Sequence, residues 1–112
     1  MRIAIPTENG RLCTHFGHCQ TFALIDVDTD GKQILASAEV VPPPHEPGLL
    51  PRWLKEQGAQ VVIAGGMGGR AVALFGAAGV EVITGAPSET PEALALAYVT
   101  GTLEQGDNAC DH

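Results

Sequence analysis

Residues 61–83 have the sequence VVIAGGMGGRAVALFGAAGVEVI, in which two apolar runs flank a glycine-rich turn and a helix-forming stretch. The β-branched run Val61–Ile63 predicts a buried strand, and the residues Ala71–Phe75 predict a helix that Gly79 ends. A second strand is predicted over Val80–Ile83. Because crossovers of this kind join parallel strands with right-handed chirality, the stretch predicts a βαβ unit and hence an α/β protein.

The residues before this unit predict antiparallel strands. Arg2–Pro6 and Thr21–Asp28 are rich in apolar and β-branched residues, and the second run partly alternates in polarity. The turn-forming residues Thr29–Lys32 separate it from Ile34–Val41, which predicts the second arm of a hairpin. The N-terminal half is therefore expected to be antiparallel.

Two more helices are expected around the βαβ unit. Leu49–Gln57 places its apolar residues on one helical face, with Pro51 in the first turn. The triplet Thr90-Pro91-Glu92 supplies an N-cap residue, a proline at the first helical position and an acid near the positive end of the helix dipole. This last helix is expected to run to about Leu103.

The length and composition are those of one compact domain. The chain has 112 residues, of which 45% are hydrophobic and 17% charged, a balance that favours packing over disorder. We expect a single domain over residues 1–105. Residues 106–112 are polar, contain Cys110 and His112, and are expected to form a flexible tail.

The charge argues against nucleic acid and anionic membranes as partners. Six Lys and Arg face thirteen Asp and Glu, which gives a net charge of −7. The apolar stretch 61–80 contains clustered glycines and Arg70, which disfavour a membrane span. The N-terminus lacks the apolar run of a signal peptide, so we expect a cytoplasmic protein whose three cysteines stay reduced.

The densest set of potential metal ligands lies in residues 13–19, CTHFGHC, which combine two thiols and two imidazoles. The tail adds another of each, and this mixture of donors suits zinc, copper(I), iron or an iron-sulfur type cluster. The spacing does not match a zinc finger, and the alternative is that the cysteines are small buried residues and the histidines pack locally. The candidate metal ligands are Cys13, His15, His18, Cys19, Cys110 and His112.

The second candidate is the loop Gly65–Arg70 between the predicted strand and helix. Residues 66–71 satisfy a relaxed form of the dinucleotide-binding fingerprint. The next strand ends at Thr84, where that fold expects an acid to hold a ribose, so a nucleotide domain is disfavoured. The loop offers backbone amides at a helix start with Arg70 nearby, which favour an anionic group, and a tight turn without a ligand is the alternative.

Nucleophilic catalysis has little support in the sequence. Ser37 and Ser88 do not lie in a Gly-x-Ser-x-Gly elbow. A thiolate of Cys13 or Cys19 beside His15 would lack a recognisable oxyanion site and a third, orienting group. We therefore expect a protein that is not an enzyme.

Five segments spread over nearly the whole chain carry a resemblance to a known family. They are Ile3-Ala4-Ile5-Pro6, His15-Phe16-Gly17 followed by Phe22, the glycine-loop segment Val61–Gly68, residues 75–82 and residues 93–103. In these segments the chain resembles the dinitrogenase iron-molybdenum cofactor biosynthesis family, whose members include cofactor carriers of nitrogenase assembly and small stand-alone proteins.

The resemblance implies a ribonuclease H-like α/β fold, with a mixed five-stranded sheet flanked by three helices, and non-covalent binding of an anionic metal-sulfur cluster. Nuclease activity is not implied, because Arg2–Pro6 carries no carboxylate to hold a magnesium ion. By residue matching, the imidazole of the His-Phe-Gly motif is the expected cluster contact and the glycine loop a wall of the site. The expected cofactor-binding residues are His15, Gly65, Gly66, Met67, Gly68, Gly69 and Arg70.

Together these observations predict a small metallocluster-binding or carrier protein for an iron-molybdenum or related metal-sulfur cofactor, with cofactor donor and acceptor proteins as partners. Two alternatives stay open: a nucleotide- or phosphate-binding regulatory module that uses Gly65–Gly69, and a mononuclear zinc- or copper-binding protein. A chain with a charge of −7 repels an anionic cluster at long range. Binding is therefore expected to depend on local amides, His15 and Arg70.

Overall fold

The computed structural model describes residues 1–13, 16, 19–44, 46 and 48–103. In this part of the chain an α/β fold combines a mixed sheet of six strands with three helices. The elements are β1 (Arg2–Glu8), β2 (Arg11–Leu12), β3 (Thr21–Asp28), β4 (Gln33–Val40), α1 (Leu49–Glu56), β5 (Val61–Ile63), α2 (Gly69–Ala77), β6 (Glu81–Ile83) and α3 (Pro91–Thr100).

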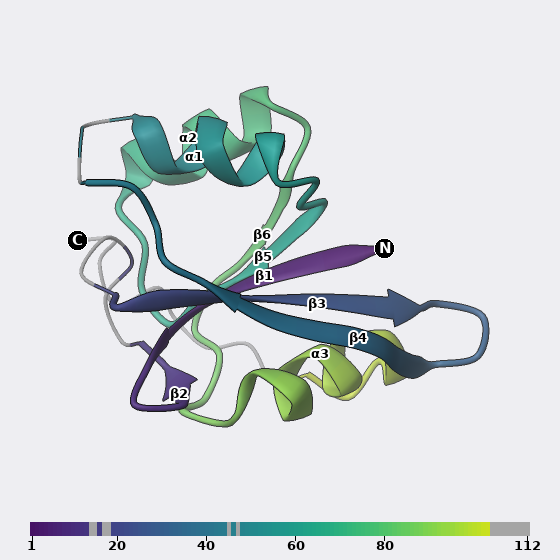
Figure 1. Cartoon of the computed structure of the whole chain (residues 1–112). Helices are drawn as coiled ribbons and strands as arrows, with labels where there is room; N and C mark the ends of the chain where they lie inside the picture. Colours follow the sequence, from purple (N-terminus) through teal and green to yellow (C-terminus); the bar gives the residue numbers. More distant parts are fainter. Residues whose placement is uncertain (14–15, 17–18, 45, 47, 104–112) are drawn as a thin grey trace.

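The strand order β4-β3-β1-β5-β6 makes β1 the centre of the sheet (Figure 1). β1 is antiparallel to β3, which is antiparallel to β4, whereas β5 is parallel to both β1 and β6. The predicted antiparallel N-terminal half and the predicted parallel βαβ unit are both confirmed. Because β1, β5 and β6 are parallel, their carboxyl ends lie at one edge of the sheet.

The sheet has a sixth strand, β2, whereas the family resemblance implies five. β2 is two residues long and pairs with the end of β1 through Glu8 and Arg11. Asn9 and Gly10 between them both have positive φ angles, 54° and 78°. This is the backbone of a two-residue hairpin turn, for which Asn-Gly is the favoured sequence. A strand of two residues is too short to show an alternating pattern, so the turn was the available signal.

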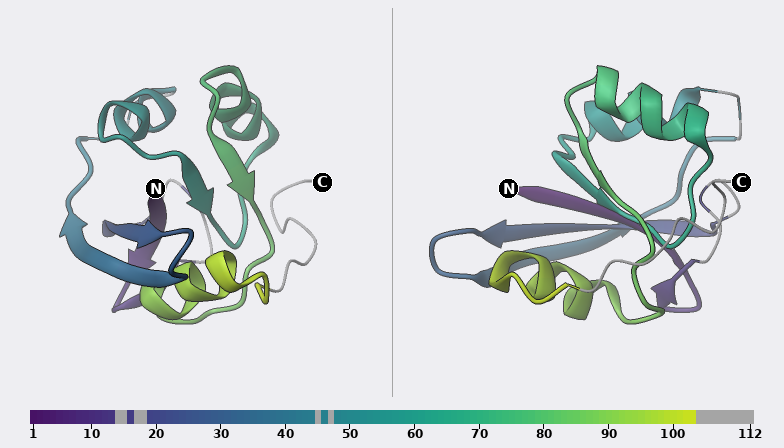
Figure 2. Two further views of the ribbon diagram at one scale, coloured as in Figure 1. Left: turned by 90° about the vertical axis from the view of Figure 1, so that its right-hand side faces the viewer. Right: turned by 180° about the vertical axis from the view of Figure 1, so that it is seen from behind.

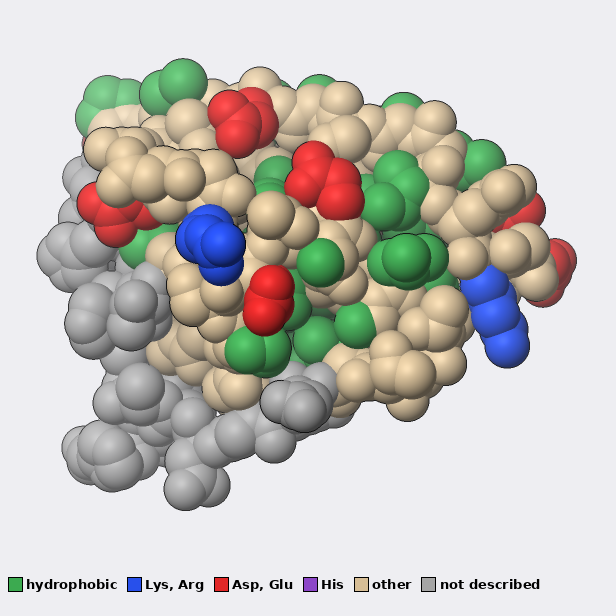
Figure 3. All heavy atoms as spheres, turned by 90° about the horizontal axis from the view of Figure 1, so that it is seen from below, with side chains coloured by type: hydrophobic (Ala, Val, Ile, Leu, Met, Phe, Trp, Pro, Cys, Tyr) green, Lys and Arg blue, Asp and Glu red, His purple; other side chains and the backbone are tan. Residues whose placement is uncertain are grey.

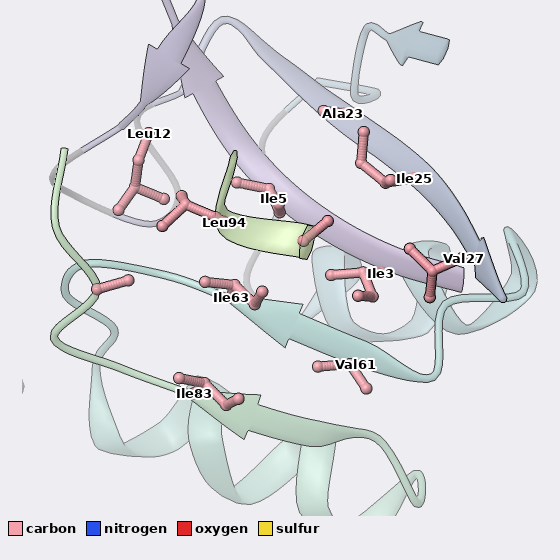
Figure 4. Packing of buried hydrophobic residues seen from close by; sticks show 12 residues of the cluster. Ile3, Ile5, Leu12, Ala23, Ile25, Val27, Val61, Ile63, Ile83 and Leu94 are labelled. Carbon is pink, nitrogen blue, oxygen red and sulfur yellow. The ribbon is translucent and has the colours of Figure 1, made fainter. Parts of the chain in front are cut away.

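Side chains alternate between the two faces of the sheet, and each face has its own helical cover (Figure 2). Ile3, Ile5 and Ile25 lie in the core cluster beneath α3, which Figure 4 shows from close by. Ala4 and Val62 lie in the opposite cluster, beneath α1 and α2. A central strand with both faces buried explains why β1 is apolar along most of its length.

The helix boundaries follow local chemistry. α3 begins with the predicted cap, in which the hydroxyl of Thr90 accepts the N–H of Ala93 at 3.3 Å. It ends at Thr100, short of the predicted Leu103, because Gly101 adopts a φ angle of 77° and stops the helix. None of the helices in the described residues is long and apolar enough to span a bilayer.

Candidate functional site

The carboxyl edge of the sheet gathers three loops. The first, of which residues 9–13, 16, 19 and 20 are described, connects β1 to β3 and contains β2. Residues 64–68 join β5 to α2, and residues 84–90 join β6 to α3. The parallel registers Ala4 with Val62 and Ile63 with Ile83 fix the starting points of these loops side by side, at the left in Figure 1. This edge, called the carboxyl edge below, contains every described residue that the sequence singled out for the site.

Backbone hydrogen bonds tie the glycine loop to both neighbouring loops. The carbonyl of Gly66 accepts the N–H of Phe16 at 3.0 Å, and the carbonyl of Gly65 accepts the N–H of Gly85 at 2.7 Å. Met67 is fully buried in the core cluster beneath α1 and α2. The first half of the predicted loop is therefore structural backbone, and the exposed part begins at Gly68.

An aromatic cluster anchors the first loop, and sequence reasoning did not predict it. The ring of Phe16 makes edge-to-face contacts with Phe22 on β3 and Phe75 on α2, at centroid distances of 5.7 and 5.6 Å. Phe22 in turn contacts Trp53 on α1 at 5.8 Å. Such contacts add to the energy of apolar burial. Phe16 thus contacts the sheet and α2 directly, and it reaches α1 through Phe22.

A second contact closes the base of the first loop. Thr7 and Thr21 form the last register pair of β1 with β3, and their hydroxyls lie 2.6 Å apart in a hydrogen bond. Thr7 is fully buried. A buried hydroxyl is stable only when it is hydrogen-bonded, so this pair fixes where the loop leaves and re-enters the sheet.

The two described cysteines of the loop differ in exposure. Cys13 is 3% exposed, and its N–H donates to the carbonyl of Pro6 at 2.9 Å. Cys19 is half-buried. Leu12, just before Cys13, donates its N–H to the carbonyl of Glu89 at 3.0 Å, which fastens the first loop to the loop after β6.

The start of α2 is open at the carboxyl edge. Gly68 precedes the helix with no side-chain cap, and no acid lies in the first turn. A Cβ added to Gly68 or Gly69 would meet nothing within 4 Å, so close packing does not require glycine there. Arg70, in the first turn, is exposed. Glycine residues and a positive charge lower the stability of a helix N-terminus. The same features favour binding of an anion, because the first backbone N–H groups of the helix and Arg70 can both attract it.

The structure thus brings part of the predicted site together. Cys13, Cys19 and the glycine loop lie at one edge of the sheet. His15, His18, Cys110 and His112 lie outside the described residues. Among the residues that are described, no three His, Cys, Asp or Glu side chains are grouped so that they could hold a metal ion.

Arg2, Asp26 and Tyr98, whose pKa values are shifted, lie toward the other end of the strands. The guanidinium of Arg2 donates to both carboxylate oxygens of Asp26, at 2.8 and 3.2 Å, and this hydrogen bonding lowers the pKa of Asp26. The hydroxyl of Tyr98 donates to Glu81 at 2.6 Å. Burial first, and then this bond to Glu81, raise the pKa of Tyr98 to about 12. Arg2 and Glu81 begin β1 and β6, so these contacts stabilise the fold at the end of the strands opposite the carboxyl edge.

Known proteins are similar to this chain in sequence and in fold. The family model described as dinitrogenase iron-molybdenum cofactor matches residues 1–101. MJ0580 of Methanocaldococcus jannaschii is 24% identical, over 94% of this chain and 91% of that protein. The crystal structure of PH0822 has a TM-score of 0.85 at 31% identity, covering 94% of each chain. The apo form of the orange protein of Desulfovibrio gigas has a TM-score of 0.76 at 23% identity, covering 96% of this chain and 93% of that one. The match over residues 1–101 shows that this chain belongs to the dinitrogenase iron-molybdenum cofactor family.

Proposed function

We propose that this chain binds an anionic metal-sulfur cluster of the iron-molybdenum cofactor class at the carboxyl edge and carries it between proteins in the cytoplasm, without catalytic turnover. The observation that carries the proposal is the 3.0 Å hydrogen bond from the N–H of Phe16 to the carbonyl of Gly66. It joins the loop rich in thiols and imidazoles to the loop that leads into α2. Soft donors and anion-binding amides therefore come from adjacent segments.

The chemistry of the two segments is complementary. A metal-sulfur cluster takes sulfur and imidazole ligands at its metals, and its negative charge favours N–H donors and cations. We assign His15, the residue before Phe16, as the principal ligand, with Cys13, His18, Cys19, Cys110 and His112 as further candidates. The exposed helix start supplies the amides, with Arg70 as the cation.

Glycine at the helix start has a function in this proposal. Gly68 has φ and ψ angles of −63° and 149°, a conformation open to any residue, so its backbone does not require glycine. Together with Gly69 it leaves the space above the amides unfilled. A large, rigid guest can then approach the backbone closely.

The test is a titration of anaerobically purified protein with isolated iron-molybdenum cofactor. Quenching of Trp53, the single tryptophan, reports binding through its contact with the aromatic cluster. We expect His15→Ala to weaken binding at least about tenfold, as the loss of one ligand contact implies. His45→Ala, in the proline-rich connector, is the matched control and should bind as the unmodified chain does.

Two other outcomes would replace the proposal. Stoichiometric zinc or copper in the purified protein, with no uptake of the cofactor, would favour a mononuclear site. Binding of ADP at micromolar concentration by a colourless, metal-free protein would favour a phosphate-binding module at residues 65–69. Unchanged cofactor binding by His15→Ala would remove that residue from the site.

A further inference from the structure

The outer edge of β4 is an open strand edge. β4 stands at the end of the strand order, with β3 paired along one side and no described strand along the other. Most of its side chains are exposed. Leu35 is 62% exposed, and Val41, directly after the strand, is 76% exposed. An eight-residue strand with an unpaired edge is a template for pairing with another chain.

The opposite edge of the sheet is protected in ways that β4 is not. β6 is three residues long, and its Glu81 is held by the hydroxyl of Tyr98. Short edge strands and charged residues are common defences against edge pairing. Gln33–Val40, by contrast, contains no proline and a single charged residue, Glu39.

A β-bulge lies within the exposed strand. The register with β3 shifts between Asp26, opposite Ala36, and Val27, opposite Ile34, so that Leu35 has no opposite residue. A bulge changes the local twist and redirects a side chain, but it leaves the edge open. On one face of β4, the exposed Ser37 donates its hydroxyl hydrogen to Glu92 of α3 at 3.4 Å. Figure 3 shows this α3 side, where acidic side chains lie among exposed hydrophobic ones.

We infer that the outer edge of β4 pairs with a second copy of this chain, with the two strands antiparallel about a two-fold axis. Charge complementarity argues for this partner. Lys32 is exposed just before β4, and Glu39 is exposed near its other end. In the antiparallel register that places Lys32 of one copy beside Glu39 of the other, this pair occurs twice, once on each side of the axis. The axis then passes between Leu35 and Ala36, so that the exposed Leu35 of each copy lies beside Ala36 of the other.

Lys32 and Glu39 of the same copy are too far apart to form an ion pair. Lys32 lies in the turn before β4, with a φ angle of 53°, and Glu39 lies near the other end of the strand, roughly 20 Å away at the usual rise per residue. At physiological salt the screening length is about 8 Å. An interaction between them that depends on both charges must therefore occur between copies.

The test is the mass of the full chain in solution, measured by sedimentation equilibrium over a concentration series. We expect the mass to rise from 11.6 kDa toward twice that value as the protein reaches about 100 µM, a weak association typical of a small interface. Lys32→Glu and Glu39→Lys should each raise the dissociation constant about tenfold, because each places like charges together at both ends. The double variant should restore it, and it has the net charge of the original chain.

Two further variants make the result specific. Lys55→Glu changes an exposed cation on α1 by the same charge and should leave dimerisation as it was. Leu35→Asp should abolish the dimer while the far-ultraviolet circular dichroism stays unchanged, since the side chain is exposed. A mass that stays at 11.6 kDa up to about 1 mM would overturn the inference. So would a double charge swap that fails to restore association. Neither result bears on cluster binding at the carboxyl edge.

Discussion

Substitutions at two glycines of α2 can distinguish an effect on helix stability from an effect on ligand binding at the start of the helix. Gly69 opens α2 at the carboxyl edge, Gly76 lies near its other end, and an added Cβ at either position would meet nothing within 4 Å. Alanine is a better helix former than glycine by up to about 1 kcal/mol. We expect Gly69→Ala and Gly76→Ala each to stabilise the fold by about 0.5 kcal/mol, measured by urea denaturation.

The two variants should differ in binding. The methyl group of Gly69→Ala occupies the space above the first-turn amides, so we expect weaker binding of isolated iron-molybdenum cofactor despite the more stable helix. Gly76→Ala is the matched control with unchanged affinity. Equal affinities for both variants would mean that the guest does not approach the start of α2.

The pKa of Tyr98 can be measured directly by ultraviolet absorbance, because it is the single tyrosine of the chain. Its pKa is raised to about 12 by burial and by the hydrogen bond to Glu81. Ultraviolet titration of the phenolate should therefore show a midpoint near 12 in the folded protein and near 10 in urea. Glu81→Gln should lower the folded midpoint only in part, since burial is the larger cause.

The raised pKa of Tyr98 determines how the free energy of unfolding changes with pH. The protonated phenol stabilises the fold fully below the unfolded pKa, and this contribution is lost as the pH rises from about 10 to about 12. Tyr98→Phe should be less stable at neutral pH and should lose less stability over that alkaline range. An equal alkaline loss in both proteins would assign the transition to another group.

Among the elements, the first loop depends on one aromatic side chain for its position. Phe16→Leu keeps an apolar side chain but removes the edge-to-face contacts with Phe22 and Phe75. We expect a loss of about 1 to 2 kcal/mol in the free energy of unfolding and a marked loss of cofactor affinity, measured by the visible absorbance of the bound cofactor.

Trp53→Phe supplies the control for this loss. It alters the same aromatic cluster at α1, away from the loop, through the 5.8 Å contact with Phe22. It should lower stability to a comparable extent while cofactor affinity stays close to that of the unmodified chain. Parallel losses of affinity in both variants would show that stability alone limits binding.

The elements that the sequence predicted are those with local signals. The βαβ unit follows from short apolar runs bounded by glycine, and α3 from the Thr90-Pro91 start. β2 had a signal too, in Asn9-Gly10, but it is only two residues long. The bond between Phe16 and Gly66 had none, because it joins residues far apart in the chain through backbone atoms. Neither the periodicity nor the spacing of residues predicts such a contact. That the two loops lie at the same edge of the sheet could be inferred only from the parallel arrangement of the strands.

Across the whole molecule, the net charge opposes binding of an anionic ligand, whereas Arg70 at the carboxyl edge favours it. The chain has a net charge of −7. Arg2 is paired with Asp26, whereas Arg11 donates to the neutral carbonyl of Ser88 at 2.9 Å and keeps its charge. Arg70 is exposed at the start of α2. An anionic guest is therefore repelled at a distance and attracted only on close approach.

This distribution predicts an unusual salt dependence of the association rate. The screening length falls from about 30 Å at 0.01 M salt to about 8 Å at 0.15 M, which removes the long-range repulsion of the −7 chain. Contacts at hydrogen-bond distance are screened far less. We expect stopped-flow association with isolated iron-molybdenum cofactor to become several-fold faster over this range, whereas steered binding becomes slower. Arg70→Gln should keep the positive slope and raise the dissociation rate, because it removes a short-range attraction. If the association rate of the unmodified chain fell as the salt concentration rose, local attraction at the carboxyl edge would outweigh the repulsion by the net charge. That result would contradict the expected long-range repulsion of the ligand.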